Sequence, residues 1–264
     1  MSQLIYQKPT SIKQAETLFQ GAEESRFLAG GMTLLPTMRQ RLVAPDRLID
    51  LAALDLCHIE DQGSVIKIGA MTTHNEIATS PIIQNKIKGL AGLAGGIGDR
   101  QVRHRGTIGG SVANNDPAAC YPAGLLALGA VIQTSHRQIT ASDYFVDLFE
   151  TALEEGELIT SIIVPVPQKS AYFKAPNPAS RYALAGVFAA LIEDAPHIAV
   201  TGAGEQGVFR WHEAEAALAN SWTTEALADL SLSDEGLFSD IHATPSFRSH
   251  LVKQMAQKAV EQSA

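Results

Sequence analysis

The chain has 264 residues, of which 45% are hydrophobic and 18% charged, and its formal net charge is −8 at pH 7. This composition is typical of a folded protein with a sizeable core, and the length allows two or three modest domains or one large one. The negative charge argues against nucleic-acid binding, because neutralising phosphates takes clustered Lys and Arg side chains. The densest basic run, Arg100–Arg105, holds only three arginines.

The first residues lack the charged and then apolar pattern of a secretory signal, and no apolar run approaches the roughly 20 residues that cross a bilayer. We therefore expect a cytoplasmic protein without a membrane span, in which Cys57 and Cys120 are reduced. Two cysteines cannot by themselves hold a zinc ion or an iron–sulfur cluster, which need about four ligands. We expect no metal site on this chain, so any redox chemistry requires an organic cofactor.

The first fifty residues alternate between strand and helix patterns. Ser11 is an expected N-cap for a helix that ends at Phe19. Strands are predicted over 26–29 and 47–51, with a helix over 33–42 between them. This order predicts a small βαβ-type unit.

From about residue 55 the pattern changes. A turn at 61–63 precedes an alternating strand over 64–69, and Thr73-His-Asn-Glu76 predicts a capping box that opens a short helix. A second helix is predicted over 82–94. We interpret 95–122 as one long irregular stretch, and loops of this length inside a compact domain are usually functional or disordered.

The rest of the chain reads as mixed strands and helices. The predicted elements are strands over 125–134 and 137–140, a helix over 145–153, a proline-rich boundary over 165–178, strands over 181–192 and 197–201, a hairpin turn, and C-terminal helices. The sequence therefore predicts an α+β fold with three units, 1–54, 55–165 and 166–264.

Two glycine-rich segments are candidates for binding an anion. The first, Ala29-Gly-Gly-Met-Thr-Leu-Leu-Pro36, lies between a predicted strand and a helix, so backbone N–H groups and a helix N-terminus converge there. Its glycines would allow a ligand to approach the backbone. The second, Gly106-Thr-Ile-Gly-Gly-Ser111, adds hydroxyl groups and is followed by Asn114, Asn115 and Asp116. On its own, the first segment is explained equally well by an ordinary tight βα turn, and the second is explained better by a turn with Asx caps.

The two segments say more together. Gly30 and Gly109 are 79 residues apart, so a ligand bound by both loops would be gripped from two sides, and a dinucleotide is long enough to need that. A third segment, Gly202-Ala-Gly-Glu-Gln-Gly207, matches the G-x-G-x-x-G dinucleotide pattern. Only 57 residues follow it, and Val208-Phe-Arg-Trp211 reads as a returning strand. We therefore interpret this third segment as a hairpin turn.

The paired motifs AGGMTLLP and RGTIGGSVANNDPAACYP resemble the flavin-binding signatures of the FAD subunits of molybdenum hydroxylases, such as the medium subunit of aerobic carbon monoxide dehydrogenase and the flavin domain of xanthine dehydrogenases. The resemblance extends over essentially the whole chain, through IGAMTTHNEI, PASRYALAGVFAAL and VTGAGEQGVFRW. It implies a PCMH-type FAD-binding fold of two subdomains, followed by a C-terminal domain with a small antiparallel sheet and helices.

The resemblance also implies which residues contact FAD. The two glycine loops would hold the pyrophosphate, with Thr107 at a family hydroxyl position, and Tyr182 would lie near the isoalloxazine. Two positions depart from the family pattern. Met32 stands where carbon monoxide dehydrogenases often have His, and Cys120 stands where many relatives have an Asp that reaches the flavin. The implied contact residues are Ala29, Gly30, Gly31, Met32, Thr33, Leu34, Thr107, Ile108, Gly109, Gly110, Ser111, Asn115, Asp116, Cys120 and Tyr182.

The function implied by the resemblance is electron transfer. Substrate would be oxidised at a molybdenum cofactor on a large partner subunit, and electrons would pass through iron–sulfur clusters of a small partner to FAD on this chain and then to quinone, NAD or oxygen. The family implies a dimer of heterotrimers. No catalytic residue is needed here, and we expect surface or capping roles for His74 and His104. The alternatives are a stand-alone PCMH-type flavin oxidase and a cofactor-free assembly module.

Overall fold

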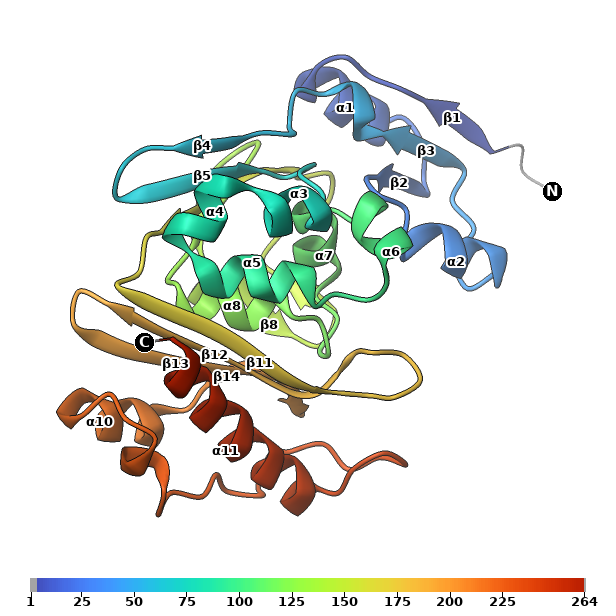
Figure 1. Ribbon diagram of the computed structural model, residues 1–264. Helices are drawn as coiled ribbons and strands as arrows, with labels where there is room; N and C mark the ends of the chain where they lie inside the picture. Colours follow the sequence, from blue (N-terminus) through green and yellow to red (C-terminus); the bar gives the residue numbers. More distant parts are fainter. Residues whose placement is uncertain (1–3, 264) are drawn as a thin grey trace.

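The computed structural model describes residues 4–263, and in Figure 1 these form three units stacked from the N-terminus to the C-terminus. The first unit is the predicted βαβ-type arrangement. Its three strands are parallel in the order β1-β3-β2, and the predicted N-cap is confirmed, because the side chain of Ser11 accepts a hydrogen bond from the N–H of Gln14. The elements of this unit are β1 (Ile5–Gln7), α1 (Ile12–Phe19), β2 (Ser25–Leu28), α2 (Leu34–Arg39), β3 (Arg47–Asp50) and a 3-10 turn (Leu51–Ala53).

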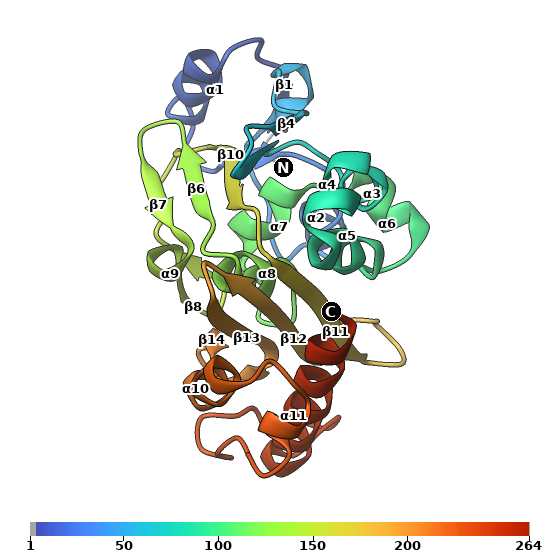
Figure 2. The ribbon, with the colours of Figure 1, turned by 60° about the vertical axis from the view of Figure 1, so that its left-hand side comes forward.

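The middle unit has a five-stranded antiparallel sheet in the order β4-β5-β10-β6-β7. The predicted capping box at Thr73 and Glu76 is confirmed at the start of α3. In Figure 2 the β6–β7 hairpin reaches α1, where Nε2 of His136 lies 3.0 Å from Oε1 of Glu16. The strands of this unit are β4 (Ile59–Asp61), β5 (Val65–Gly69), β6 (Val131–Thr134), β7 (Gln138–Thr140) and β10 (Ile159–Pro165). Its helices are α3 (His74–Thr79), α4 (Pro81–Lys86), α5 (Lys88–Gly95), α6 (Arg100–Arg105), α7 (Ile108–Asn114), α8 (Tyr121–Ala127) and α9 (Ala141–Tyr144).

The prediction that 95–122 is irregular was wrong. This stretch contains α6 and α7 and the start of α8, each of them only six or seven residues long. Helices this short gain stability from capping: the side chains of Asp99 and Thr107 accept hydrogen bonds from the backbone N–H groups of Val102 and Gly110 at the starts of α6 and α7. The helix predicted over 82–94 is in fact two helices that break at Ile87. The strand predicted over 125–134 begins only at β6.

The helix predicted over 145–153 was also wrong, because β8 (Phe145–Asp147) and β9 (Glu150–Thr151) form a small hairpin there. Phe149 has φ +56°, which does not fit a right-handed helix. The amide of Asn115 donates hydrogen bonds to the carbonyl oxygens of Asp147 and Glu150, at 2.9 and 2.8 Å. Contacts with a residue 32 to 35 positions away therefore fix this segment as a hairpin.

The C-terminal unit is an antiparallel sheet in the order β11-β12-β13-β14, covered by α10 and α11 on one face and by α5 and α8 of the middle unit on the other (Figure 1). The G-x-G-x-x-G segment is a hairpin as predicted, since Gly204 pairs with Gly207. The proline-rich boundary predicted over 165–178 contains a missed strand, β11. The elements are β11 (Lys169–Pro176), β12 (Ala183–Ile192), β13 (Ala195–Gly204), β14 (Gly207–Arg210), α10 (His212–Asn220), a 3-10 turn (Glu225–Leu227) and α11 (Pro245–Gln262).

The three larger sheets lie within residues 1–54, 55–165 and 166–264, but the cores beneath them are shared. Leu158, from the middle unit, packs in the core of the first unit around Ala15 and Ile49. Phe188, from the C-terminal sheet, packs in the core of the middle unit. The units therefore depend on one another for burial, and the borders at 54/55 and 165/166 stay predictions. No helix in the part described has both the length and the apolar character needed to cross a membrane.

Candidate functional site

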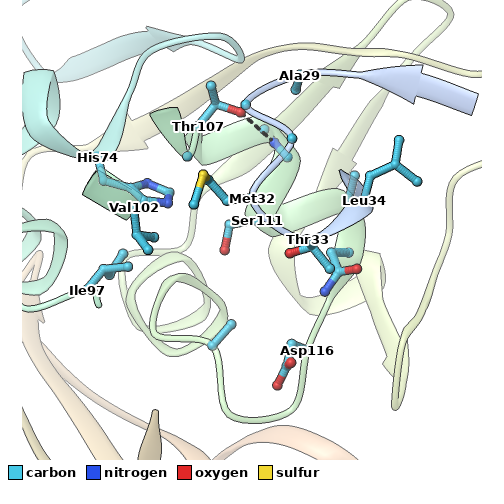
Figure 3. Close-up of a pocket in the computed structure, with 18 of the residues that line it drawn as sticks. Ala29, Met32, Thr33, Leu34, His74, Ile97, Val102, Thr107, Ser111 and Asp116 are labelled. Carbon is cyan, nitrogen blue, oxygen red and sulfur yellow. Dashed lines mark hydrogen bonds between the residues drawn. The ribbon is translucent and has the colours of Figure 1, made fainter. Parts of the chain in front are cut away.

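A cavity of about 760 Å³ is lined by residues from all three units. Figure 3 shows its centre, where the segment from Ala29 to Leu34 faces the segment from Thr107 to Ser111. Every predicted contact residue except Ile108 and Asn115 lines this cavity. Whether these residues bind a cofactor stays a prediction, but the fold does bring them to one place.

The two glycine loops touch each other. A Cβ atom built on Gly30 would overlap the carbonyl oxygen of Arg105 and lie 2.9 Å from the Cα of Gly106. A Cβ on Gly110 would lie 3.5 Å from the Cβ of Ala29. We expected the glycines to admit a ligand to the backbone. At Gly30 the direct reason is different, because a side chain there would force the two loops apart.

The first loop has free backbone donors. Within the described part of the chain, the N–H groups from Gly30 to Leu34 donate no recorded hydrogen bond, and the next N–H, of Leu35, donates to the carbonyl oxygen of Gly31. Gly31 has φ +73°, the left-handed conformation that glycine adopts without strain. Successive N–H groups in such a turn form a concave site for an anion.

In the second loop, the backbone N–H groups from Ile108 to Ser111 already donate hydrogen bonds within the protein. The N–H groups of Ile108 and Gly109 donate to the carbonyl oxygens of Thr72 and Ala70, at 3.0 and 2.9 Å. The N–H of Gly110 donates to Oγ1 of Thr107 at 3.1 Å, the contact dashed in Figure 3. From Ile108 to Ser111 this loop therefore offers a ligand mainly side chains, above all that of Ser111, whereas the first loop offers a continuous run of free N–H groups.

Ile108 and Asn115 have structural positions. Ile108 is fully buried in the core of the middle unit. Asn115 ends α7 in a left-handed conformation, φ +42°, and its amide secures the β8–β9 hairpin. Neither side chain reaches the cavity, so a direct contact between either side chain and a cofactor finds no support in this geometry.

One end of the cavity is formed by Asp116, Cys120, Lys174 and Tyr182. The carboxylate of Asp116 accepts a hydrogen bond from the N–H of Ala118 at 2.8 Å, and burial raises the pKa of this carboxyl above its ordinary value. Burial, followed by the charges of Asp116 and Cys120, also raises the pKa of Tyr182. These shifts indicate that the three groups lie close together.

Lys174 is a cavity residue that the sequence reasoning missed. Its Nζ lies 3.5 Å from Sγ of Cys120, and it projects from β11, inside the stretch that we had interpreted as a boundary. The strand-favouring aromatic residues Tyr172 and Phe173 could have revealed a strand there, but the flanking prolines hid it.

His74 also lines the cavity, which corrects the surface role expected for it. The side chain is 4% exposed and its Nδ1 lies 3.2 Å from the hydroxyl oxygen of Tyr121. Burial, with a smaller contribution from the positive charge of Arg103, lowers the pKa of His74 to about 4. The imidazole is therefore neutral near pH 7. His104 is exposed, as expected.

The cavity falls in the upper part of the range for ligand sites, roughly 300–1,000 Å³. Its free N–H groups favour an anion, and its other end carries aromatic and titratable side chains. Among residues 4–263, no group of three or more His, Cys, Asp or Glu side chains is arranged to hold a metal. The fold and the site thus define an α+β protein that binds an extended anionic cofactor.

Comparison with known proteins identifies the family. Residues 2–167 match the family described as FAD binding domain in molybdopterin dehydrogenase, and the chain belongs to this family of oxidoreductase subunits. Over 97% of its length the chain is 33% identical to the nicotine 6-hydroxylase medium subunit of Paenarthrobacter nicotinovorans, covering 95% of it. It is 31% identical to the carbon monoxide dehydrogenase medium chain of Hydrogenophaga pseudoflava, with coverages of 97% and 95%.

The fold is confirmed by solved structures. A chain of the reconstituted CO dehydrogenase from Oligotropha carboxidovorans superposes with a TM-score of 0.90 at 31% identity, covering 99% of this chain and 97% of that one. The match spans the C-terminal sheet as well as the two N-terminal units, so the predicted PCMH-type architecture with a C-terminal α+β unit is correct.

Proposed function

We propose that this chain holds FAD in the central cavity and passes electrons from the iron–sulfur clusters of a partner subunit to an external acceptor. The contact between the two glycine loops carries the proposal, because residues about 79 positions apart meet at one cavity where backbone donors are free. A dinucleotide cofactor with an anionic centre fits such a site. FAD supplies the redox chemistry when bound, since it can exchange electrons one or two at a time.

The N–H groups from Gly30 to Leu34 would hold the pyrophosphate, with the hydroxyl of Ser111 on the opposite side. The isoalloxazine would then lie toward Asp116, Cys120 and Tyr182. In this arrangement the protein binds and orients the cofactor, and buried walls such as Ile159 keep water from it. No general base or nucleophile is required for this task.

The partners follow from the names of the relatives. Relatives are described as a medium subunit or a medium chain, which supports a complex with a large and a small subunit. We propose that the large partner carries the molybdenum cofactor, that the small partner carries the iron–sulfur clusters, and that two such heterotrimers form a dimer. Substrate would be chosen on the large subunit, and quinone, NAD and oxygen all stay open as acceptors.

The same names favour this function over the two alternatives. A stand-alone flavin oxidase would carry its own substrate domain, whereas this chain aligns with 95% of a protein described as a medium subunit. A cofactor-free assembly module would not need free N–H groups in a cavity of this size.

The test is the colour of the protein and of one variant. The full chain, purified with its partner subunits, should show flavin absorption bands. Gly110→Val should abolish FAD retention while leaving the fold, because the new side chain would lie between Thr107 and Ala29, with its Cβ 2.9 Å from Oγ1 of Thr107. Circular dichroism would check the fold. Gly92→Val is the control, since nothing lies within 4 Å of a Cβ at Gly92. Unchanged FAD affinity in Gly110→Val would contradict the proposed site.

A further inference from the structure

Lys174 differs from two other charged side chains that line the cavity, Arg26 and Glu157, because each of these forms an ion pair. Arg26 lies 3.3 Å from the carboxylate of Glu24, and Glu157 lies 3.0 Å from the guanidinium of Arg137. Lys174 makes no ion pair with any residue between 4 and 263. Within the same residues, its one polar contact joins Nζ to Sγ of Cys120, a side chain that is itself only 5% exposed.

The surroundings of Lys174 leave its charge uncompensated. The side chain is partly buried, and an ammonium removed from water without a carboxylate partner is costly. The carboxylate at the same end of the cavity, Asp116, uses Oδ1 to accept the N–H of Ala118 and forms no ion pair with Lys174. Arg181, which likewise forms no ion pair within the described part of the chain, adds a second cation where this end meets a smaller cavity of about 260 Å³. This end of the site therefore favours negative charge on whatever it holds.

We propose that Lys174 compensates the negative charge that the isoalloxazine of FAD gains on reduction, and so raises its reduction potential. The inference rests on the proposed function, which places this ring at the same end of the cavity. The oxidised ring is neutral. Uptake of two electrons from the partner's iron–sulfur clusters and one proton from solvent leaves it with one negative charge, which a nearby ammonium stabilises.

The protein is arranged so that this effect is not cancelled. Among residues 4–263, Sγ of Cys120 approaches Nζ more closely than any carboxylate oxygen does, because none of their carboxylates lies within 4.0 Å. A thiol is a weak hydrogen-bonding group and, while protonated, carries no charge. Lys174 is a positioning and tuning residue in this account, and it neither donates nor accepts an electron.

The experiment is a spectroscopic titration of the flavin potential in the full chain with FAD bound. Lys174→Met should destabilise the reduced form relative to the oxidised form by at least tenfold, which corresponds to a potential about 30 mV lower for a two-electron couple. Lys174→Arg, which keeps the charge, should restore most of the potential. Lys169→Met is the matched control, because Lys169 lies on the same strand but lines neither cavity.

Three outcomes would overturn the inference. The first is an unchanged potential in Lys174→Met with FAD still bound. The second is an equal loss of affinity for oxidised and reduced FAD, which would make Lys174 an anchor for the phosphates. The third is the same shift in Cys120→Ala, which would mean that Lys174 acts only through Cys120. A colourless wild-type chain would instead contradict the proposed function itself.

Discussion

The two glycine loops look alike in sequence, but the structure gives them different tasks. The first loop, from Ala29 to Leu34, leaves its N–H groups free and includes a left-handed glycine, Gly31. In the second loop, the N–H groups of Ile108 and Gly109 bond to the turn that follows β5, and the N–H of Gly110 bonds to the helix cap. A diglycine therefore does not by itself indicate a phosphate-binding backbone.

The difference lies in what each glycine packs against. A Cβ on Gly109 would lie 2.6 Å from the Cβ of Ala70, so this glycine lets α7 sit directly on the end of β5. Gly30 lets the first loop rest on the backbone of Arg105 and Gly106, which lead into the second loop. The second loop is thus the support, and the first loop is the surface whose free N–H groups are available to an anion.

The largest effect is expected from Gly30→Val. Its Cβ would overlap a backbone carbonyl, which cannot move aside like a flexible side chain. Separating the loops should lower FAD affinity by at least 100-fold and cost about 1–3 kcal/mol of folding stability, the usual range for overpacking. Fluorescence titration with FAD and thermal unfolding would measure the two effects.

Gly92→Ala serves as the control for Gly30→Val, because Gly92 is an exposed helical glycine with open space around it. This substitution should raise stability by up to about 1 kcal/mol and leave FAD affinity unchanged. If Gly30→Val bound FAD as well as the control does, the contact between the loops would not be required for binding.

The pH dependence of folding stability should report on the second loop, the support, through the neighbouring His74. The backbone N–H of His74 donates to the carbonyl oxygen of Gly106 at 2.9 Å, and a Cβ built on Gly106 would lie 2.6 Å from Nε2 of the imidazole. His74 therefore supports the segment that leads into the second loop. The pKa of its imidazole falls from 6.5 to about 4 on folding, chiefly through burial. The unfolded chain therefore binds the proton more strongly, and the stability present above pH 6.5 is lost as the pH falls toward 4.

The loss should be on the order of 3 kcal/mol, since each pKa unit corresponds to about 1.4 kcal/mol. Denaturant unfolding at several pH values would measure it. His74→Gln, which stays neutral, should reduce the slope of the free energy of unfolding against pH between pH 6.5 and 4. The carboxylates are the same in both proteins, so they affect both equally. Identical slopes for the two proteins would show that His74 does not carry this pH dependence.

The sequence predicted best what depends on neighbours along the chain. The strand, glycine loop and helix around Ala29 were foreseen because strand and helix patterns flank two glycines. The rejection of the G-x-G-x-x-G segment was correct for a similar reason, since Val208-Phe-Arg reads as a returning strand. The short helix α7 was missed because IGGSVAN has little helical propensity. Burial of Ile108 and Val112 and the cap at Thr107 supply what the local sequence lacks.

Contacts made at long range account for the other errors. The hairpin at 145–151 depends on the amide of Asn115, and nothing in its own sequence reports that contact. Strand β11 looked like a linker because prolines bound it. It lies at the edge of the sheet, where Pro176 ends the strand at a shift of register. Proline is tolerated at such positions, so the strand and the cavity-facing Lys174 escaped notice.

The smallest effect, and the sharpest comparison, comes from one substitution made in both loops. Thr107 caps α7 by accepting the N–H of Gly110, whereas Thr33 at the start of α2 makes no side-chain cap bond. Thr107→Val should therefore cost about 1 kcal/mol of stability. Thr33→Val should change stability by less than about 0.5 kcal/mol and should leave FAD affinity nearly unchanged, because the free donors there belong to the backbone. Chemical unfolding of both variants would measure the two losses of folding stability. Equal losses would contradict the distinction between the second loop as the support and the first loop as the surface.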